Sequence, residues 1–259
     1  MNDIPSFNSY IEQTIKDNWL LDALTDYKGA TLQYHDVARK IEKLHIMMEA
    51  AGIQKGDRIA VCGRNSAHWA VAFLATLTYG AVIVPILHEF NDEQIHNIVN
   101  HSESRLLFVG DYIVNVIDEK QMPHLEGILN LPDFSIYVSH NEQLTDARER
   151  LNELFGKKYP NAFRRDNVHW HQDTPEEMCM INYTSGTTGF SKGVMLPYRA
   201  LWGNVDFCQK RLGVHMPKFS NTLSILPMAH MYGMAIEFLF PFCSGYHLYF
   251  LTRLPSPAV

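Results

Sequence analysis

The chain has 259 residues, of which 46% are apolar, and its formal net charge is −6. This composition suffices for a hydrophobic core in one large domain or two smaller ones, and the negative charge argues against a nucleic acid partner. The four cysteines form no CxxC pair and no signal peptide precedes them, which is typical of buried, reduced thiols in a cytosolic protein. We therefore expect a cytoplasmic location.

Amphipathic and apolar patterns alternate along the chain and predict helices and short strands in turn. The predicted helices cover residues 8–27, 34–51, 65–79, 90–101 and 141–158. The predicted strands cover residues 57–63, 81–85, 105–110, 135–139, 178–183, 193–197 and 222–227. Residues 231–251 repeat the pattern of residues 68–85, namely an apolar helix, a glycine and a strand. This alternation, with continuous apolar strands, indicates an α/β fold with mainly parallel sheets.

Helix ends carry local signals. Gly52 is a suitable C-cap for the helix that precedes it, and Asn65 or Ser66 can cap the helix that ends near Tyr79. Asn91 is a suitable cap for the next helix, since acidic residues fill the first turn that follows.

One stretch could be mistaken for a membrane span, because residues 70–87 carry no charge. Gly80 and Pro85 interrupt it, and its second half is β-branched. A helix, a turn at Gly80 and a buried strand are therefore favoured over a transmembrane helix, and we expect no transmembrane segment.

Residues 156–175 read as an irregular connection and supply the best internal boundary. We therefore predict a first α/β subdomain with N-terminal helices over residues 1–175. A phosphate-loop segment and the start of a second, incomplete α/β subdomain would occupy residues 176–259.

The stretch "NYTSGTTGFSKGVML", residues 182–196, interrupts the apolar pattern with small hydroxyl residues, glycines and one lysine. Glycines let backbone N–H groups converge on one point, and hydroxyls and Lys192 add donors and a positive charge, as a phosphate chain requires. The spacing does not fit a Walker A loop, because Gly193 follows Lys192 instead of preceding it. A mobile serine- and glycine-rich linker would not need a Lys-Gly pair between two strands.

The run "YTSGTTGFSKG", residues 183–193, closely resembles the phosphate loop of the adenylate-forming superfamily, [YF]-[TS]-S-G-[TS]-T-G-x-P-K-G. Every position fits except Ser191, where the family usually has proline. Residues 32–44 and 56–86 resemble early segments of the same family, and "LPMAHMYGM", residues 226–234, resembles its "LPLxHxxG" segment. Within the superfamily, the chain is most similar to acyl-CoA synthetases of the long-chain fatty acid type.

The resemblance implies two packed α/β subdomains with part of a small β-barrel. It also implies an enzyme that joins a carboxylate to ATP, with Mg²⁺ assisting, and then transfers the acyl group to coenzyme A. The residues that match the family's phosphate donors are Thr184, Ser185, Thr187, Thr188 and Lys192, while Gly186 and Gly189 permit close approach. The implied partner is a fatty acid or another carboxylate substrate, and peripheral contact of the parent enzyme with a membrane would serve to collect fatty acids, although nothing in this chain shows an anchor.

His230 matches the histidine that lies near the acyl carboxylate in this family; without the motif, an ordinary loop histidine would be the preferred interpretation. Tyr232 and Gly233 would border the acyl pocket. Three methionines near this histidine could line the pocket, and core packing is an equally good interpretation. They are Met228, Met231 and Met234.

Other candidates carry less weight. His169 and His171 have the spacing of one strand face, but no further ligand is evident, so we expect no metal site. Residues 164–166 read as a solvated turn, and no G-x-S-x-G motif supports a Ser-His-Asp hydrolase.

The family's later "YGxTE" and "TGD" segments and its C-terminal catalytic lysine do not occur in this chain. No carboxylate can therefore be assigned to the ribose or the metal. We expect an N-terminal portion that is inactive alone and that self-associates through exposed apolar surface. The alternatives are a non-catalytic nucleotide- or acyl-binding module, or a ligase for a short or aromatic acid.

Overall fold

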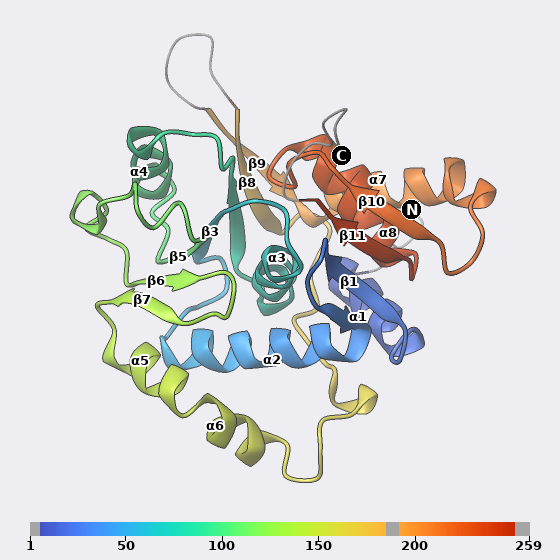
Figure 1. The fold of residues 1–259 in the computed structure, drawn as a ribbon, viewed down its shortest axis with the longest axis horizontal. Coiled ribbons are helices and arrows are strands. Elements are labelled where there is room, and N and C mark those ends of the chain that lie inside the picture. The colour runs from blue at the N-terminus through green and yellow to red at the C-terminus, as the bar shows by residue number, and fades with distance from the viewer. Residues whose placement is uncertain (1–5, 185–191, 252–259) are drawn as a thin grey trace.

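The computed structural model describes residues 6–184 and 192–251, and over these ranges the strands form two sheets (Figure 1). The seven-stranded sheet has the order β7-β6-β5-β3-β4-β8-β9, and the four-stranded sheet has the order β10-β11-β1-β2. The four-stranded sheet contains β1 (Asp22–Asp26), β2 (Thr31–Gln33), β10 (Asn221–Ser224) and β11 (His247–Phe250). The larger sheet contains β3 (Arg58–Cys62), β4 (Val82–Ile86), β5 (Leu106–Val109), β6 (Gly127–Asn130), β7 (Ile136–Ser139), β8 (Met178–Thr184) and β9 (Lys192–Pro197).

Most neighbouring strands run parallel, and the antiparallel pairs are β1–β2, β6–β7 and β8–β9. The helices are α1 (Phe7–Asp17), α2 (Tyr34–Ala50), α3 (Ala67–Tyr79), α4 (Asp92–His101), α5 (Glu142–Glu149), α6 (Leu151–Lys158), α7 (Tyr198–Arg211), α8 (Phe240–Cys243) and the π-helix η4 (Gly233–Leu239). The predicted α/β class with largely parallel sheets is confirmed.

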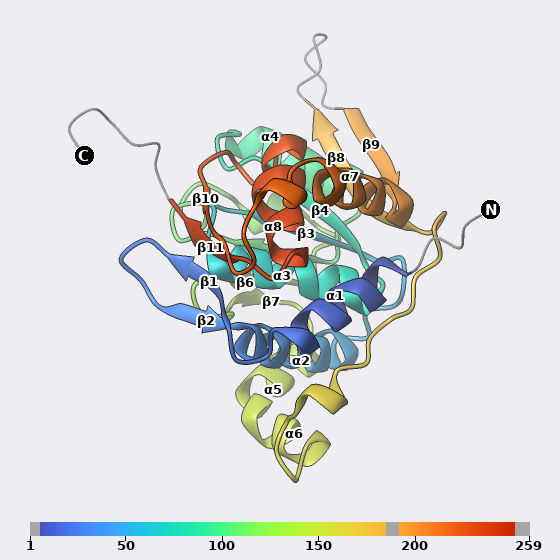
Figure 2. The ribbon, with the colours of Figure 1, turned by 90° about the vertical axis from the view of Figure 1, so that its right-hand side faces the viewer.

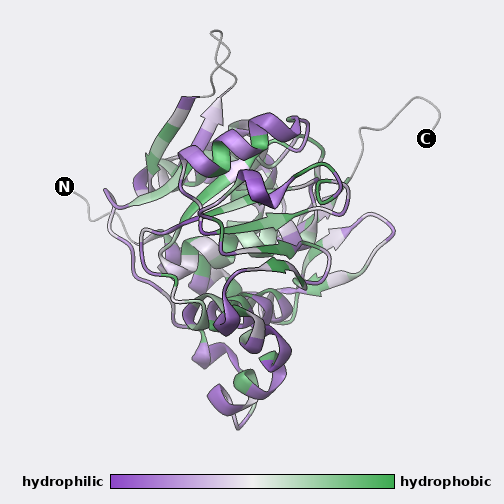
Figure 3. Ribbon diagram, turned by 90° about the vertical axis from the view of Figure 1, so that its left-hand side faces the viewer, coloured by the Kyte–Doolittle hydropathy of each residue, from purple (hydrophilic) through white to green (hydrophobic). Residues whose placement is uncertain are grey.

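Both faces of the larger sheet are covered. Along β3, Ile59 and Val61 enter the large hydrophobic cluster that contains α3, whereas Ala60 and Cys62 enter a second cluster with α4. Figure 3 shows the apolar strands inside and more polar segments outside. The strand patterns are therefore continuous apolar runs because a helix covers each face.

The uncharged stretch that could suggest a membrane span is a helix, a turn and a strand, as predicted. Ser66 caps α3 by accepting a hydrogen bond from the Trp69 N–H, and Gly80 ends the helix in the left-handed region at φ +85°. β4 follows and is buried at every position between β3 and β8. In the described part of the chain, no helix has the length and apolarity that crossing a membrane requires.

Three sequence-based predictions of elements require correction. The helix predicted over residues 8–27 ends at Asp17, and Asp22–Asp26 forms β1 instead. The helix predicted over residues 141–158 breaks at Arg150 into α5 and α6, both of which contact α2. Residues 169–171 are irregular and form no strand face.

The sequence patterns did not reveal α7 and β6. The helix, glycine and strand predicted over residues 231–251 are confirmed: helical turns come first, Gly245 follows at φ +74°, and β11 comes last. Both sheets contain strands from either side of residue 175, and the division into subdomains at that position stays a prediction.

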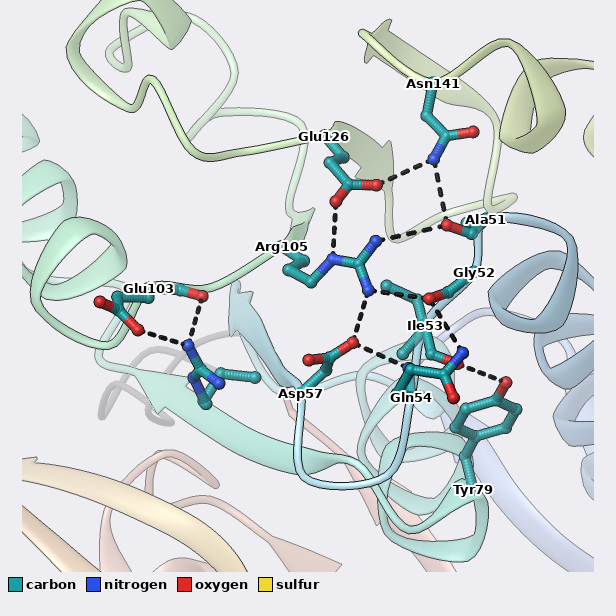
Figure 4. A network of polar contacts seen from close by, with 11 residues as sticks. Ala51, Gly52, Ile53, Gln54, Asp57, Tyr79, Glu103, Arg105, Glu126 and Asn141 are labelled. Atoms are coloured by element: carbon teal, nitrogen blue, oxygen red, sulfur yellow. Dashed lines mark hydrogen bonds and ion pairs between the residues drawn. The ribbon is translucent and has the colours of Figure 1, made fainter.

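β3, β5 and β6 all begin at one edge of the larger sheet, which we call the amino edge. A network of hydrogen bonds and ion pairs centred on Arg105 lies at this edge (Figure 4). Arg105 Nε donates to Glu126 Oε1 at 2.6 Å and Nη1 donates to the Gly52 carbonyl at 2.9 Å, while the guanidinium also pairs with Asp57. Asn141 Nδ2 completes the network by donating to Glu126 Oε2 at 2.8 Å. Every charge in this group therefore has a partner.

Candidate functional site

The phosphate-loop candidates lie on the hairpin formed by β8 and β9, which projects at the top of Figure 2 with α7 beside it. The two strands pair antiparallel, with Thr184 opposite Lys192 and Asn182 opposite Val194. Thr184 and Lys192 are both exposed. The remaining candidates lie outside the described residues. They are Ser185, Gly186, Thr187, Thr188 and Gly189.

Strand geometry places Thr184 and Lys192 on one face of the hairpin. Successive side chains of a strand point to opposite faces, and residues directly opposite in a pair share a face. Thr184 therefore lies on the same face as Asn182 and as Lys192, which is its partner across the ladder. This arrangement brings a hydroxyl and an ammonium group together next to the segment 185–191.

Tyr183 points to the other face and anchors the hairpin. Its hydroxyl forms a 2.6 Å hydrogen bond with Nδ1 of His101 at the end of α4, and burial raises its pKa. A Cβ atom on Gly193, which lies opposite, would be 3.1 Å from Cζ of Tyr183 and 2.9 Å from Cγ2 of Ile181. Gly193 therefore makes room for the tyrosine ring, a structural role that the motif alone does not reveal.

His230 lies in the loop that follows β10, and a buried amide fixes this loop. The Asn65 side chain, 5% exposed, accepts a hydrogen bond from the Met228 N–H at 2.9 Å and donates to the Leu226 carbonyl at 2.8 Å. Asn65 follows β3, so it ties the larger sheet to the loop. The prediction that Asn65 or Ser66 caps α3 thus resolves to Ser66.

A second buried amide connects the histidine loop to the hairpin. Asn182 Nδ2 donates to the Ala229 carbonyl at 3.1 Å, and Asn182 is 6% exposed. Because Asn182 shares its strand face with Thr184, the loop that carries His230 lies on the face of Thr184 and Lys192. Sequence reasoning missed Asn182; the available signal was one amide within an apolar strand.

The π-helix η4 also holds the loop that carries His230. Glu237 Oε2 accepts hydrogen bonds from the N–H groups of Ile225 and Leu226, at 2.7 and 2.8 Å. A Cβ atom on Gly233 would lie 2.5 Å from the Pro227 carbonyl oxygen, so only glycine fits there. A π-helix is rare and occurs frequently at functional sites.

His230 and Tyr232 are exposed, the latter by 57%. The Tyr232 N–H donates to Nδ1 of His230 at 3.3 Å, which orients the imidazole. Met228 and Met234 are core residues, 1% and 0% exposed, and Met231 packs partly against the same core. The structure therefore brings a hydroxyl, an ammonium group and an imidazole to one edge of the molecule, where they can hold an anionic ligand.

Comparisons with known proteins identify the family of the chain. The model of the family described as AMP-binding enzyme matches residues 13–259. Long chain acyl-CoA synthetase 3 of Arabidopsis thaliana is 26% identical over 210 residues, covering 79% of this chain and 31% of that protein. The chain thus spans about a third of the length of the curated relatives it matches.

Two solved structures show the same fold. The red-emitting luciferase of Phrixothrix hirtus has a TM-score of 0.82 at 18% identity and covers 99% of this chain and 48% of its own. The anthranilate CoA ligase AuaEII, in complex with anthranoyl-AMP, has a TM-score of 0.76 at 17% identity; the match covers 96% of this chain and 44% of the ligase. Because the family match extends over almost the entire sequence, this chain belongs to the AMP-binding enzymes of the adenylate-forming superfamily.

Proposed function

We propose that this chain is the nucleotide-facing portion of an ATP-dependent acyl-CoA synthetase that activates a long-chain fatty acid. The observation that carries the proposal is the shared face of Thr184, Lys192 and the His230 loop at the end of β8. The long-chain substrate class is supported by the relatives named as long-chain synthetases, which are similar at low identity.

In this proposal Lys192 and the hydroxyl of Thr184 bind the β- and γ-phosphates of ATP. Ser185, Thr187 and Thr188 add donors, and Gly186 and Gly189 let the backbone approach the phosphates. Formation of acyl-AMP leaves negative charge on the departing pyrophosphate. Donors that are already fixed around it lower the barrier, because they need no reorganisation as the charge develops.

His230 lies beside the carboxylate of the fatty acid in this proposal, with Tyr232 and Gly233 at the border of the acyl pocket. The hydrogen bonds from Asn65, Asn182 and the neighbouring Glu237 hold the backbone that carries the imidazole. The exposed imidazole can therefore orient the carboxylate toward the α-phosphate without moving its loop.

Mg²⁺ would neutralise phosphate charge, and coenzyme A would accept the acyl group. Over residues 6–184 and 192–251, no cluster of three or more histidine, cysteine or acidic side chains could hold a metal ion. Glu237 is already engaged by two backbone N–H groups. In this proposal Mg²⁺ is held through the ATP phosphates, and we assign no residue here to Mg²⁺ or coenzyme A.

Calorimetric titration with ATP and with pyrophosphate tests the nucleotide site. We expect Lys192→Ala to weaken both ligands by about tenfold or more, because a charge-assisted hydrogen bond is lost. Lys120→Ala, which changes an exposed lysine elsewhere, should leave the affinities unchanged. Equal affinities in all three proteins, or no binding by the unaltered chain, would contradict the proposal.

Pyrophosphate exchange separates catalysis from binding. Since the chain spans about a third of its relatives' length, we expect this polypeptide to bind ATP without supporting exchange. In the protein encoded by the complete reading frame, long-chain acids should support faster exchange than aromatic or short acids. Binding without exchange in that protein would favour a non-catalytic module, and faster exchange with anthranilate would favour an aromatic-acid ligase.

Self-association is part of the same proposal. Val194 and Met195 are 45% and 66% exposed on β9, which is the edge strand of the larger sheet. Exposed apolar edge strands favour pairing with another chain. Light scattering after size exclusion should show a dimer or larger species, and Met195→Lys should shift it toward the monomer.

A further inference from the structure

A small cavity lined by basic side chains lies far from the nucleotide site. It has a volume of about 270 Å³ and is bounded by α2, by the turn between β6 and β7, and by α5 and α6. We call it the cation pocket, after Lys40, Lys43 and Arg148, which line it. In Figures 1 and 2, α5 and α6 lie at the bottom of the molecule and the β8–β9 hairpin lies at the top.

Lys40 is half-buried, and within the described residues its ammonium group forms no hydrogen bond or ion pair. Its neighbour Lys43 donates to Oδ1 of Asn152 at 2.8 Å and lies 5.5 Å from the centre of the Phe155 ring. Neither contact supplies a negative charge. A partly desolvated ammonium group without a counter-charge is unfavourable unless a ligand supplies that charge.

Arg148 is held in place by neutral groups. Its Nε donates to the Phe134 carbonyl at 2.8 Å and Nη2 donates to the Asp133 carbonyl at 3.2 Å. These bonds orient the guanidinium, and neither acceptor is a carboxylate. Within residues 6–184 and 192–251, none of the three cations lies within 4.0 Å of a carboxylate oxygen.

Three cationic side chains and two carboxylates line the cavity, so basic groups are in excess there. Burial and Lys43 lower the pKa of Lys40 despite an opposing effect of Asp36, and burial with Arg39 and Arg148 lowers the pKa of Lys43. Three acids lie nearby. Asp133 and Glu149 also line the cavity; Asp133 accepts a hydrogen bond from the Ser135 N–H at 2.9 Å, and Glu149 is exposed. Asp36 Oδ1 lies 3.6 Å from Nη1 of Arg39.

We propose that the cation pocket binds a phosphate group, through the ammonium groups of Lys40 and Lys43 and the guanidinium of Arg148. The volume is ample for one phosphate with several waters, since a water occupies about 30 Å³ in the liquid. The phosphate belongs to a small soluble molecule or to a phospholipid headgroup, because both present the same oxygens. This site is independent of the proposed function and uses none of its residues.

Inorganic phosphate is the first probe, titrated at low ionic strength into the Lys192→Ala protein so that the nucleotide site contributes least. Saturable binding is expected, and Lys40→Gln should weaken it by about tenfold, because one charge-assisted contact is lost. Lys157→Gln is the matched control, since this lysine is exposed on α6 and pairs with Glu153. Lys40→Arg preserves the charge and should retain most of the affinity.

Vesicles distinguish the two sources. Sedimentation with phosphatidic acid vesicles that depends on Lys40, together with no binding to phosphatidylcholine, assigns the phosphate to a lipid headgroup. Saturable inorganic phosphate binding without vesicle binding assigns it to a soluble molecule. The proposal is overturned if neither probe binds, if Lys40→Gln and Lys157→Gln behave alike, or if Lys40→Arg loses as much affinity as Lys40→Gln.

Discussion

The two edges of the seven-stranded sheet use polar side chains in opposite ways. At the amino edge, Arg105 satisfies two carboxylates and the carbonyl of Gly52, so every charge is paired within the protein. At the opposite, carboxyl edge, where β3, β4 and β8 end, buried Asn65 and Asn182 hold the backbone, while Thr184 and Lys192 remain exposed. Ligands of open α/β sheets bind at the carboxyl edge. The amino edge therefore stabilises the sheet, whereas the carboxyl edge presents hydrogen-bond donors to a ligand.

The largest effect should come from the amino edge. Arg105→Ala leaves Asp57 and Glu126 without their cationic partner at a site where these side chains are only 20% and 29% exposed. We expect the free energy of unfolding to fall by about 3 kcal/mol, measured by urea denaturation. ATP affinity of the folded protein should not change. A loss in ATP affinity as large as that of Lys192→Ala would break the distinction between the two edges.

The packing of α2 against α3 should also respond to pH through His45, which is 7% exposed and whose Nε2 lies 2.9 Å from the Ala75 carbonyl oxygen. Burial lowers its pKa from 6.5 to about 4. Between these values the unfolded state binds the proton more readily, so the stabilisation is complete above pH 6.5 and is lost as the pH falls toward 4. The loss should be about 3 kcal/mol, since each pH unit between the two pKa values contributes about 1.4 kcal/mol.

Urea denaturation across this pH range checks the prediction, with His45→Gln as the comparison protein because glutamine keeps an N–H donor. The difference in unfolding free energy between the two proteins should shrink as the pH falls. Parallel pH profiles would show that His45 does not titrate differently in the folded and unfolded states.

At the carboxyl edge, Asn65→Ala removes hydrogen bonds that reach Met228 and Leu226. The expected loss of unfolding free energy is about 2 kcal/mol, because buried backbone groups lose their partners. Hydrogen exchange of the Met228 amide should accelerate. Asn115→Ala is the control, since that amide makes only an exposed bond to the Asp111 carbonyl. If both variants exchange alike, Asn65 does not fix the loop.

The smallest effect should come from Gly193→Ala. The added methyl group would lie 2.9 Å from Ile181 Cγ2 and 3.1 Å from Tyr183 Cζ, so the tyrosine ring must shift. We expect a loss of about 1 kcal/mol in unfolding free energy, measured by thermal or urea denaturation. Gly203→Ala, which meets no atom within 4 Å, should be neutral or stabilising. A neutral Gly193→Ala would remove the close-packing explanation for this glycine.

The sequence predicted those elements whose signals are local. α2, the turn at Gly80 and the Asn91 cap of α4 were all predictable, because periodicity, a left-handed glycine and an N-cap depend on a few neighbouring residues. β1 pairs with β2, a three-residue strand that follows it closely, and with β11, where Leu24 faces Leu248 far along the chain. The helical pattern was extended through β1 because one of its two partners is distant and the other is too short to give a strand signal.

The same reasoning explains what sequence could say about the site. The motif named Thr184, Lys192 and His230, because their residue types and spacing carry the chemistry. Asn65 and Asn182 escaped notice, since their function is to bond a loop that lies far along the chain. Local signals at Asn65 indicated only a helix cap. Positioning residues of this kind become visible only when the tertiary contacts are known.

Hydrogen exchange with and without pyrophosphate, measured in a Lys40→Gln background to remove the cation pocket, tests the central claim most directly. The account predicts slower exchange over residues 183–194 and 226–230 when pyrophosphate binds, with no change over residues 51–57 at the amino edge. Protection of the amino edge, or unchanged exchange over residues 183–194 at saturating pyrophosphate, would contradict the claim that the carboxyl edge holds the phosphates.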